Sequence, residues 1–501
     1  MTGKDKRFDS RNLLLVVTIM LIISFLRGTG GCAQREYLES VSRKMDVSST
    51  KTRIIRLPVS TSKVFVTPVV PDYSSGKEII DYKTTFNPKT INAKDGEVTL
   101  EVTSIPIIVE EAIENGRKTS DIESSPFGFL GVGENYDENL PYLKDIGVKW
   151  VRYAGRSGIV WDIVEPEKER FNWYYNDSLY LKTSKDGINM VITILNPSRW
   201  DRAERDGRRP SHRLPRNIDA YKNFLKKVVE RYNGDGIDDA PGSPVIKYWQ
   251  IQNEPDIFWR DTPEDFARFL KISYQVIKEY NKNAKVVLAG VGMPSGVQKF
   301  YIPMLKHLNK IKDGKGDRYF DIFDLHWIEG GTGGYKTTKG LMDERTNFRE
   351  LIKHIRESLD LYGYNNVPIW ITEMASYDGK PRNRRINFPF ESERDYASEL
   401  FKRYIYPLSL GVEKIFWVSL IEWQNFDGEG VNGYFDSVGL INNPRNDGSS
   451  HKKIAYYTYK LMVEKLNGTY WNKMKTLELG KDIFAYRLIK NSNIMYVIWV
   501  E

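Results

Sequence analysis

Between about Phe127 and about Leu466, short apolar segments alternate with longer segments that carry apolar residues at helical spacing. The short segments are rich in β-branched and aromatic residues, which is typical of strands buried in a sheet. Eight of them are predicted as strands: Phe127–Val132, Trp150–Tyr153, Met190–Leu195, Tyr248–Asn253, Val286–Gly290, Ile322–Trp327, Ile369–Glu373 and Ile415–Leu420.

The longer segments have the pattern of amphipathic helices. Strand, helix and strand at this spacing indicate a parallel sheet with helical crossovers. Eight such units predict a closed (β/α)8 TIM barrel over residues 126–468, with catalytic groups at the C-terminal ends of its strands. The clearest predicted helices are Ile218–Tyr232, Pro263–Tyr280, Phe348–Tyr362 and Glu393–Tyr406, the third of which places Leu351, Ile355, Leu359 and Leu361 largely on one face.

Two glutamates end apolar strands of this predicted barrel. Asn253-Glu254-Pro255 follows the fourth strand, and Glu373 ends the seventh. Both side chains are therefore expected at the same mouth of the barrel. A lone carboxylate is costly to bury, so a glutamate in this place favours a functional role. Cleavage of a glycosidic bond requires two carboxylates, because one protonates the leaving oxygen while the other attacks the anomeric carbon or activates water.

Further motifs surround the two glutamates: Trp150-Val151-Arg152, Trp161, Glu165-Pro166, Phe171-Asn172-Trp173, Gly439-Leu440-Ile441 and the segment from Lys453 to Tyr457. Together they resemble clan A glycoside hydrolases, which are retaining barrel enzymes, and in particular families 39, 42 and 5. The resemblance covers roughly two thirds of the chain. It does not single out one family, so it does not specify the sugar.

The resemblance implies a role for each residue of the site. Glu254 would be the acid/base and Glu373 the nucleophile of a double displacement through a covalent glycosyl-enzyme. Arg152 would hydrogen-bond the nucleophile, and Asn253 would bind the 2-hydroxyl group of the sugar. The alternative for Arg152 is a structural salt bridge, which also needs a carboxylate partner.

The sixth strand departs from the family pattern. Many relatives place a tyrosine near the nucleophile here, whereas this chain has His326-Trp327, which leaves open what contacts Glu373 from that side. Both residues are expected to line the cleft, although His326 is equally consistent with a core histidine. No cofactor is expected. The chain has five histidines without a spacing suited to a metal ion, so no metal site is expected either.

Trp417 and Trp423, in and after the eighth strand, are candidates for an aromatic platform under a sugar ring. Such a platform suits the apolar C–H groups of a pyranose. Trp417 is preferred because clan relatives carry this tryptophan on the strand. The alternative is that both residues only pack.

The N-terminus has the pattern of an export signal over residues 1–33. Four basic residues precede the apolar stretch Leu13–Leu26, which is too short to predict a membrane span. Cys32 is the only cysteine and follows small residues, so the segment resembles a bacterial lipoprotein site and predicts an exported, lipid-anchored protein. Cleavage after Ala33 and an uncleaved anchor are the alternatives. Residues 34–52 are polar and are predicted as a tether.

Short β-like runs flank the barrel, in residues 53–125 and 469–501. They predict a small accessory β-sandwich built from both sides of the barrel, whose C-terminal part ends within a strand and is either incomplete or an end strand. The runs are Val64–Val66, Val98–Val102, Ile105–Val109, Ile483–Leu488 and Met495–Val500.

The net charge is +8, of which +3 comes from the first 33 residues, and this is too little to indicate a nucleic-acid partner. Positive charge gathers in two predicted mouth loops, residues 201–216 and 378–385. A cationic rim would favour an acidic glycan, with uronate or sulfate groups. The simpler explanation is solvated loops that pair with nearby acids. A second functional class also stays open, namely a barrel that has lost catalysis and serves as a glycan-binding or structural envelope lipoprotein.

Overall fold

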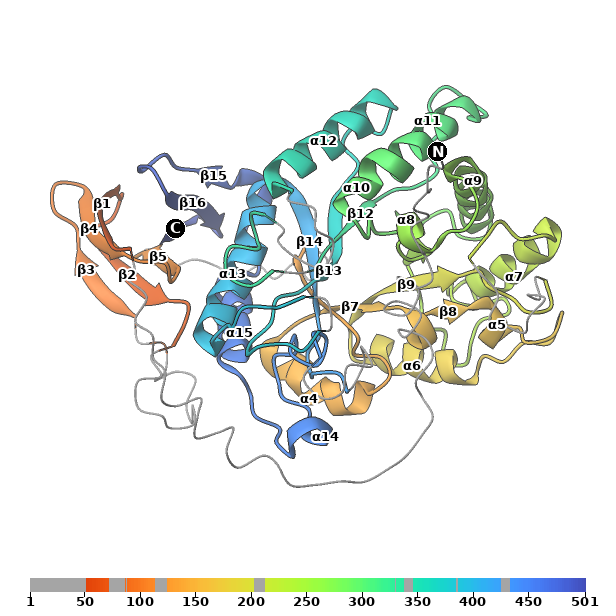
Figure 1. The fold of residues 1–501 in the computed structure, drawn as a ribbon, viewed down its shortest axis with the longest axis horizontal. Helices are drawn as coiled ribbons and strands as arrows, with labels where there is room; N and C mark the ends of the chain where they lie inside the picture. Colours follow the sequence, from red (N-terminus) through yellow and green to blue (C-terminus); the bar gives the residue numbers. More distant parts are fainter. Residues whose placement is uncertain are drawn as a thin grey trace, which may run out of the picture.

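The computed structural model describes residues 51–71, 86, 88–112, 124–201, 212–328, 330–337, 346–383, 386–424 and 433–501. At its centre, parallel strands form a barrel wrapped by helices (Figure 1), which confirms the predicted fold class. Isolated bridges from Val287 to Ile322 and from Val291 to Leu325 join the first and last strands of the sheet order. The barrel strands are β6 (Phe127–Leu130), β7 (Trp150–Tyr153), β9 (Asn189–Leu195), β10 (Tyr248–Ile251), β11 (Lys285–Leu288), β12 (Phe323–Trp327), β13 (Ile369–Met374) and β14 (Val412–Val418).

The helices follow the strands as crossovers, and two of them begin with a capping box. Thr262 and Asp265 cap α9, and Ser392 and Asp395 cap α13, so each box satisfies backbone N–H groups of the first turn. On α12 one expectation is wrong, because Leu361 is 73% exposed at the last position of the helix. The larger helices are α4 (Tyr136–Ile146), α6 (Tyr174–Lys185), α7 (Ile218–Arg231), α9 (Pro263–Tyr280), α11 (Ile302–Lys310), α12 (Phe348–Leu361), α13 (Glu393–Ser409) and α15 (Ile454–Leu466).

The inside of the barrel has an apolar layer and a polar layer. Large side chains including Trp150, Trp370 and Phe416 form a separate buried cluster. Side chains alternate along a strand, so the residues two positions further on also point inward, one layer closer to the C-terminal ends. These residues are polar and fully buried: Arg152, Thr193, Gln250, Asp324 and Thr372. The polar layer lies directly beneath the mouth of the barrel.

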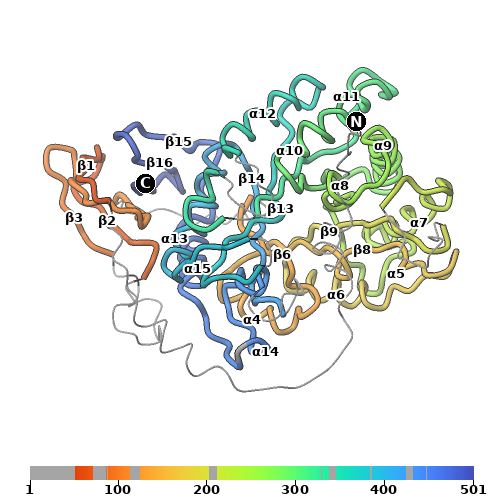
Figure 2. The backbone as a smooth tube through the Cα atoms, viewed as in Figure 1, coloured from red at the N-terminus to blue at the C-terminus, as the bar shows by residue number. Residues whose placement is uncertain are grey.

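Two antiparallel sheets form the accessory part, with strands from both sides of the barrel. β17 pairs with β5, which places Tyr496 opposite Val109 although these residues come from opposite ends of the described chain. Figure 2 shows the two chain segments side by side. The sheets share one apolar cluster, which includes Leu57, Val64 and Ile498. The larger sheet has the order β15 (Lys475–Thr476), β16 (Ile483–Lys490), β17 (Asn493–Val500), β5 (Ile107–Glu111), β2 (Lys63–Pro68), β3 (Lys89–Asn92), and the smaller one pairs β1 (Arg53–Pro58) with β4 (Glu97–Val102).

The described residues include no helix that is both long and apolar enough to cross a membrane. The predicted export signal, Cys32 and the tether up to residue 50 lie outside the described residues.

Candidate active site

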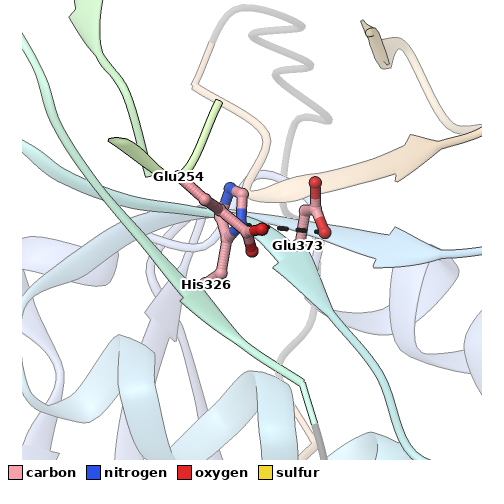
Figure 3. Close-up of side chains that lie close together, drawn as sticks. All are labelled: Glu254, His326 and Glu373. Carbon is pink, nitrogen blue, oxygen red and sulfur yellow. Dashed lines mark hydrogen bonds and ion pairs between the residues drawn. The ribbon is translucent and has the colours of Figure 1, made fainter. Parts of the chain in front are cut away.

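Glu254 and Glu373 lie together at the C-terminal ends of β10 and β13 (Figure 3). One oxygen of each carboxylate and a ring nitrogen of His326 lie within 4.8 Å of one another. The two glutamates are 7% and 8% exposed. Glu254 adopts a left-handed backbone conformation, with φ at 42° and ψ at 59°, directly before Pro255 and the short helix α8 (Pro255–Phe258). Such a conformation is uncommon for a residue with a side chain, and residues that adopt it are found more often at functional sites.

Two glycines after β11 make room for this arrangement. A Cβ atom on Gly290 would lie 2.1 Å from Nε2 of His326, and a Cβ atom on Gly292 would lie 3.0 Å from the Cδ atom of Glu254. Asp256 holds the backbone here, because its carboxylate accepts hydrogen bonds from the amides of Gly292 and Met293. Burial raises the pKa of Asp256 to about 7. The glycines let the acid and the histidine lie against the backbone of the β11 loop.

Arg152 fixes the orientation of three groups at once. Its guanidinium donates to Oε1 of Glu373 at 2.6 Å, to Oδ1 of Asn253 at 2.7 Å and to Oε1 of Gln250 at 2.7 Å. The contact with Glu373 is the one that the family resemblance implies. Since Asn253 accepts through its oxygen, its amide nitrogen is left to face the site as a donor.

Beneath Arg152 lies a polar network that the sequence analysis did not identify. Nε2 of Gln250 donates to Oδ2 of Asp324 at 2.5 Å. Thr372 donates to the same carboxylate from its backbone amide at 2.9 Å and from its hydroxyl group at 2.5 Å. Thr193 donates to Oε1 of Gln250 at 2.8 Å. These residues alternate with the large apolar residues of the inner layer, and that period-two pattern is the signal that could have revealed them.

His326 connects this network to both glutamates. Nδ1 lies 2.7 Å from Oε1 of Glu254 and 3.7 Å from Oε2 of Glu373. Nε2 lies 3.2 Å from the hydroxyl oxygen of Thr372 and 3.4 Å from Oδ2 of Asp324. Burial lowers the pKa of this histidine, but the charge of Glu373 and the hydrogen bonds with Asp324 and Glu254 outweigh burial and raise it to about 10. A pKa raised in this way favours the imidazolium form of His326 at neutral pH.

The three groups at the mouth also have the donor types and the spacing of a metal site. The surrounding charge argues against that use. Arg152 already donates to Glu373, and the Nδ1 proton of the imidazolium occupies the space between His326 and Glu254. A metal ion would have to displace that proton and lie close to a buried guanidinium.

Two tryptophans lie elsewhere than expected. Trp417 is fully buried and packs on Tyr396 and Tyr404 of α13, so it faces the helices instead of the cleft. Trp327 is buried as well, and its indole nitrogen donates to the carbonyl oxygen of Gly334 at 2.8 Å. Neither side chain is placed to contact a sugar, because both point out of the barrel.

Trp423 is only partly buried in the loop after β14. Its ring stacks on Phe435 with centroids 5.4 Å apart and an interplanar angle of 18°. The same ring occupies the space that a side chain on Gly131 would need. Of the two tryptophans proposed as a platform, Trp423 is thus the one that retains exposed surface.

A second polar chain includes Gln252, two residues before Glu254. Gln252 has a positive φ of 70°, its side-chain oxygen accepts a hydrogen bond from Nδ1 of His212 at 2.7 Å, and its side-chain nitrogen donates to Asn196. Burial lowers the pKa of His212 to about 4, so this histidine is neutral. The pKa values of His212 and His326 are thus shifted in opposite directions.

The cationic loops are described only in part. Arg213 pairs with Asp261 at 3.1 Å, as the simpler explanation expects. Lys380 and Arg382 are exposed. Residues 202–211, which hold four of the arginines, and residues 384–385 lie outside the described residues.

No protein-family model matches the chain. Among solved structures, a family 39 glycoside hydrolase from the gut symbiont Bacteroides cellulosilyticus WH2 is similar with a TM-score of 0.55 and 17% identity, over 89% of this chain and 87% of that one. A glucosidase from Croceicoccus marinus is similar with a TM-score of 0.51 and 16% identity, over 74% and 76% of the chains. At these identities the likeness shows the fold alone. The predicted likeness to barrel glycoside hydrolases is thus confirmed for the fold. It does not single out one family.

Proposed function

We propose that this chain is a glycoside hydrolase that cleaves O-glycosidic bonds of a glycan with retention of configuration. The observation that carries the proposal is the pair of carboxylates within 4.8 Å at the ends of β10 and β13. Retaining enzymes hold their two carboxyl groups about 5–5.5 Å apart, whereas inverting enzymes need about 6.5–9.5 Å to admit water between them. The structures of similar fold include a family 39 glycoside hydrolase and a glucosidase, which supports the same reaction.

The contacts of each glutamate suggest how the roles divide. Glu373 accepts from the permanently charged Arg152, which favours a carboxylate ready to attack the anomeric carbon. Within the described parts of the chain, Glu254 contacts no guanidinium group and faces His326, which suits a group that must give up and regain a proton. Asn253 would donate its amide N–H to a sugar hydroxyl group.

The proposal is tested with a matched pair of variants. In Glu373→Gly we expect hydrolysis of an activated aryl glycoside to fall by several orders of magnitude, and azide to restore turnover with an inverted glycosyl azide as product. In Glu254→Ala, azide should instead give a glycosyl azide of retained configuration, because the glycosyl-enzyme still forms. The products are identified by NMR.

Other outcomes contradict the proposal in distinct ways. Exchanged product configurations would reverse the two roles, full activity of both variants would show that neither glutamate is catalytic, and a wild-type protein without hydrolytic activity would leave the glycan-binding class. Neutral and uronate-bearing oligosaccharides should be compared as substrates of the wild-type protein. Lys380 and Arg382 are exposed after β13 and could pair with the carboxylate of a uronate. Equal cleavage of both sets would remove the acidic-glycan hypothesis.

We also propose that the protein is exported and anchored by lipid on Cys32, on the strength of the sequence pattern in residues 1–33. Expressed in full in a bacterial host, the protein should partition into the membrane fraction and incorporate labelled palmitate. Cys32→Ser should abolish labelling and release the protein from membranes. Membrane association without labelling in both forms would point to the uncleaved anchor instead.

A further inference from the structure

The hydrogen-bond network under the mouth determines where protons lie, starting from Arg152. An arginine can only donate, so the group that Arg152 contacts on Gln250 must be its oxygen. The nitrogen of Gln250 therefore faces Asp324 and donates to it. Asp324 is fully buried and also accepts both hydrogen bonds of Thr372, the closer one from the hydroxyl group.

This assignment fixes one proton on His326. The single hydroxyl hydrogen of Thr372 is used toward Asp324 at 2.5 Å, so the hydroxyl oxygen can only accept from His326. Nε2 of His326 lies 3.2 Å from that oxygen and 3.4 Å from the carboxylate of Asp324. Both neighbours are acceptors, which means that Nε2 carries a hydrogen.

The other ring nitrogen then has only two states. If His326 is neutral, Nδ1 is an acceptor, and Glu254 must be protonated to satisfy the 2.7 Å contact. If His326 is an imidazolium, Nδ1 donates and Glu254 is a carboxylate. In either state one proton lies between Nδ1 and Oε1. Gly290 makes room for the ring in this position, because a side chain there would occupy the space that the ring fills.

We propose that Glu254 and His326 hold this proton in common and act as one acid/base unit, an inference that rests on the function proposed above. His326 is a positioning residue in this scheme, since it acts through Glu254. The groups that face it are Glu254 and Glu373 at Nδ1, and Asp324 and Thr372 at Nε2, with Arg152 on the far side of Glu373. The charges of Asp256 and Glu254 also interact.

The unit gives up this proton in the first step of the reaction and regains one in the second. In the first step the bond from the anomeric carbon to the leaving oxygen breaks, a carboxylate oxygen of Glu373 bonds to the carbon, and the shared proton leaves through Glu254 to the leaving oxygen. In the second step a water molecule gives a proton to the unit. The water oxygen bonds to the anomeric carbon, and the ester bond to Glu373 breaks.

The nucleophile also controls the shared proton. Glu373 loses its negative charge when it forms the ester, and that charge lies 3.7 Å from Nδ1. A histidine keeps its proton more weakly once an opposite charge beside it disappears. Attack by Glu373 therefore pushes the proton from His326 toward Glu254 at the moment when the leaving oxygen needs it.

The experiment compares pH profiles of kcat/KM for wild type and His326→Gln, which removes the titrating ring. We expect the alkaline limb to move to lower pH by about two units or more, because the proton is then held by a single glutamate, whose ordinary pKa is about 4.3. The loss should be largest for poor leaving groups and small for a dinitrophenyl glycoside, which needs little protonation. His212→Gln is the matched control, since it removes a buried, neutral histidine that bonds to Gln252, two residues before Glu254, and should leave the limb in place.

A second measurement does not depend on turnover. With ¹⁵N-labelled histidine, the signal lost in His326→Gln identifies His326 among the five histidines, and it should show both nitrogens protonated at neutral pH. In Glu254→Gln, His326 should lose its Nδ1 proton at a lower pH than it does in the wild-type protein. An unprotonated Nε2, or an alkaline limb that does not move, would overturn the proposal. A protonated His326 in a protein that cleaves no glycoside would instead count against the proposed function.

Discussion

Gly290 is the residue on which the geometry of His326 depends most directly. Its Cβ atom, if present, would lie 2.1 Å from Nε2 of His326 and 2.8 Å from Oδ2 of Asp324, and neither group has space to retreat. In Gly290→Ala we therefore expect kcat/KM to fall by about 100-fold or more through displacement of the ring. The unfolding free energy should fall by about 1–3 kcal/mol from overpacking.

Gly316→Ala is the control for this substitution. Nothing lies within 4 Å of a Cβ atom at that position, and its backbone is not in the left-handed region, so both quantities should stay close to wild type. Activity is compared by initial rates and stability by urea unfolding. Unchanged activity in Gly290→Ala would mean that the ring position does not matter for the reaction.

At the scale of single residues, the sequence points to polar residues that end an apolar run. Polar residues that lie within a strand and face the inside of the barrel could not be recognised in the same way. Glu254 and Glu373 stand out because each ends an apolar run. Asp324 and Thr372 lie within strands, where a buried polar residue is visible only once its partners across the barrel are known. Trp417 was misplaced for a related reason. Its neighbour Phe416 points into the barrel, so alternation sends Trp417 outward to α13.

At the scale of elements, prediction succeeded where the pattern was long and periodic. The eight barrel strands and the helices α7, α9, α12 and α13 lie within a few residues of their expected bounds. Their ends were less predictable, because termini depend on caps and on tertiary contacts. α12 gives one example, since Leu361 is the last residue of the helix and is 73% exposed, and at about 100° per residue it falls off the face that Leu351, Ile355 and Leu359 share.

The loop after β12 shows how helices support the site. Glu399 on α13 accepts from the backbone amides of Gly333 and Tyr335, and it pairs with the fully buried Arg403 at 3.0 Å. Arg403 in turn donates to the carbonyl oxygen of Gly330. Residues 330–335 follow the strand that carries His326, so α13 holds the chain just beyond the histidine. Such long-range contacts cannot be derived from spacing along the sequence.

At the scale of the whole molecule, the accessory sheet is joined to the barrel through that same loop. The carboxylate of Glu501, at the end of β17, accepts from Tyr335 at 2.5 Å, from Lys336 at 2.7 Å and from Lys402 of α13 at 3.2 Å. The flanking β-runs were visible in the sequence, but their partners were not. Pairing of β17 with β5 joins segments that the whole barrel separates, and strand propensity alone carries no information about that choice.

Glu501 makes this junction dependent on pH. Burial opposes its charge, but Lys402, Lys336 and the hydroxyl group of Tyr335 outweigh burial and lower its pKa below the ordinary 4.5. A carboxyl group with a lowered pKa in the folded state stabilises that state fully above its unfolded value, and the contribution is lost as pH falls through the folded value. In Glu501→Gln we therefore expect the unfolding free energy to drop by about 1–2 kcal/mol near neutral pH.

The difference between Glu501→Gln and wild type should shrink once the pH falls below 4.5, because Glu501 is then protonated first in the unfolded wild-type chain and, at still lower pH, in the folded one. Urea unfolding across this pH range measures it. Glu478→Gln, which changes an exposed carboxylate between β15 and β16, controls for the loss of one charge and should differ little from wild type at any pH. A constant difference between Glu501→Gln and wild type across the range would show that shape and hydrogen bonding, instead of charge, hold the sheet to the barrel.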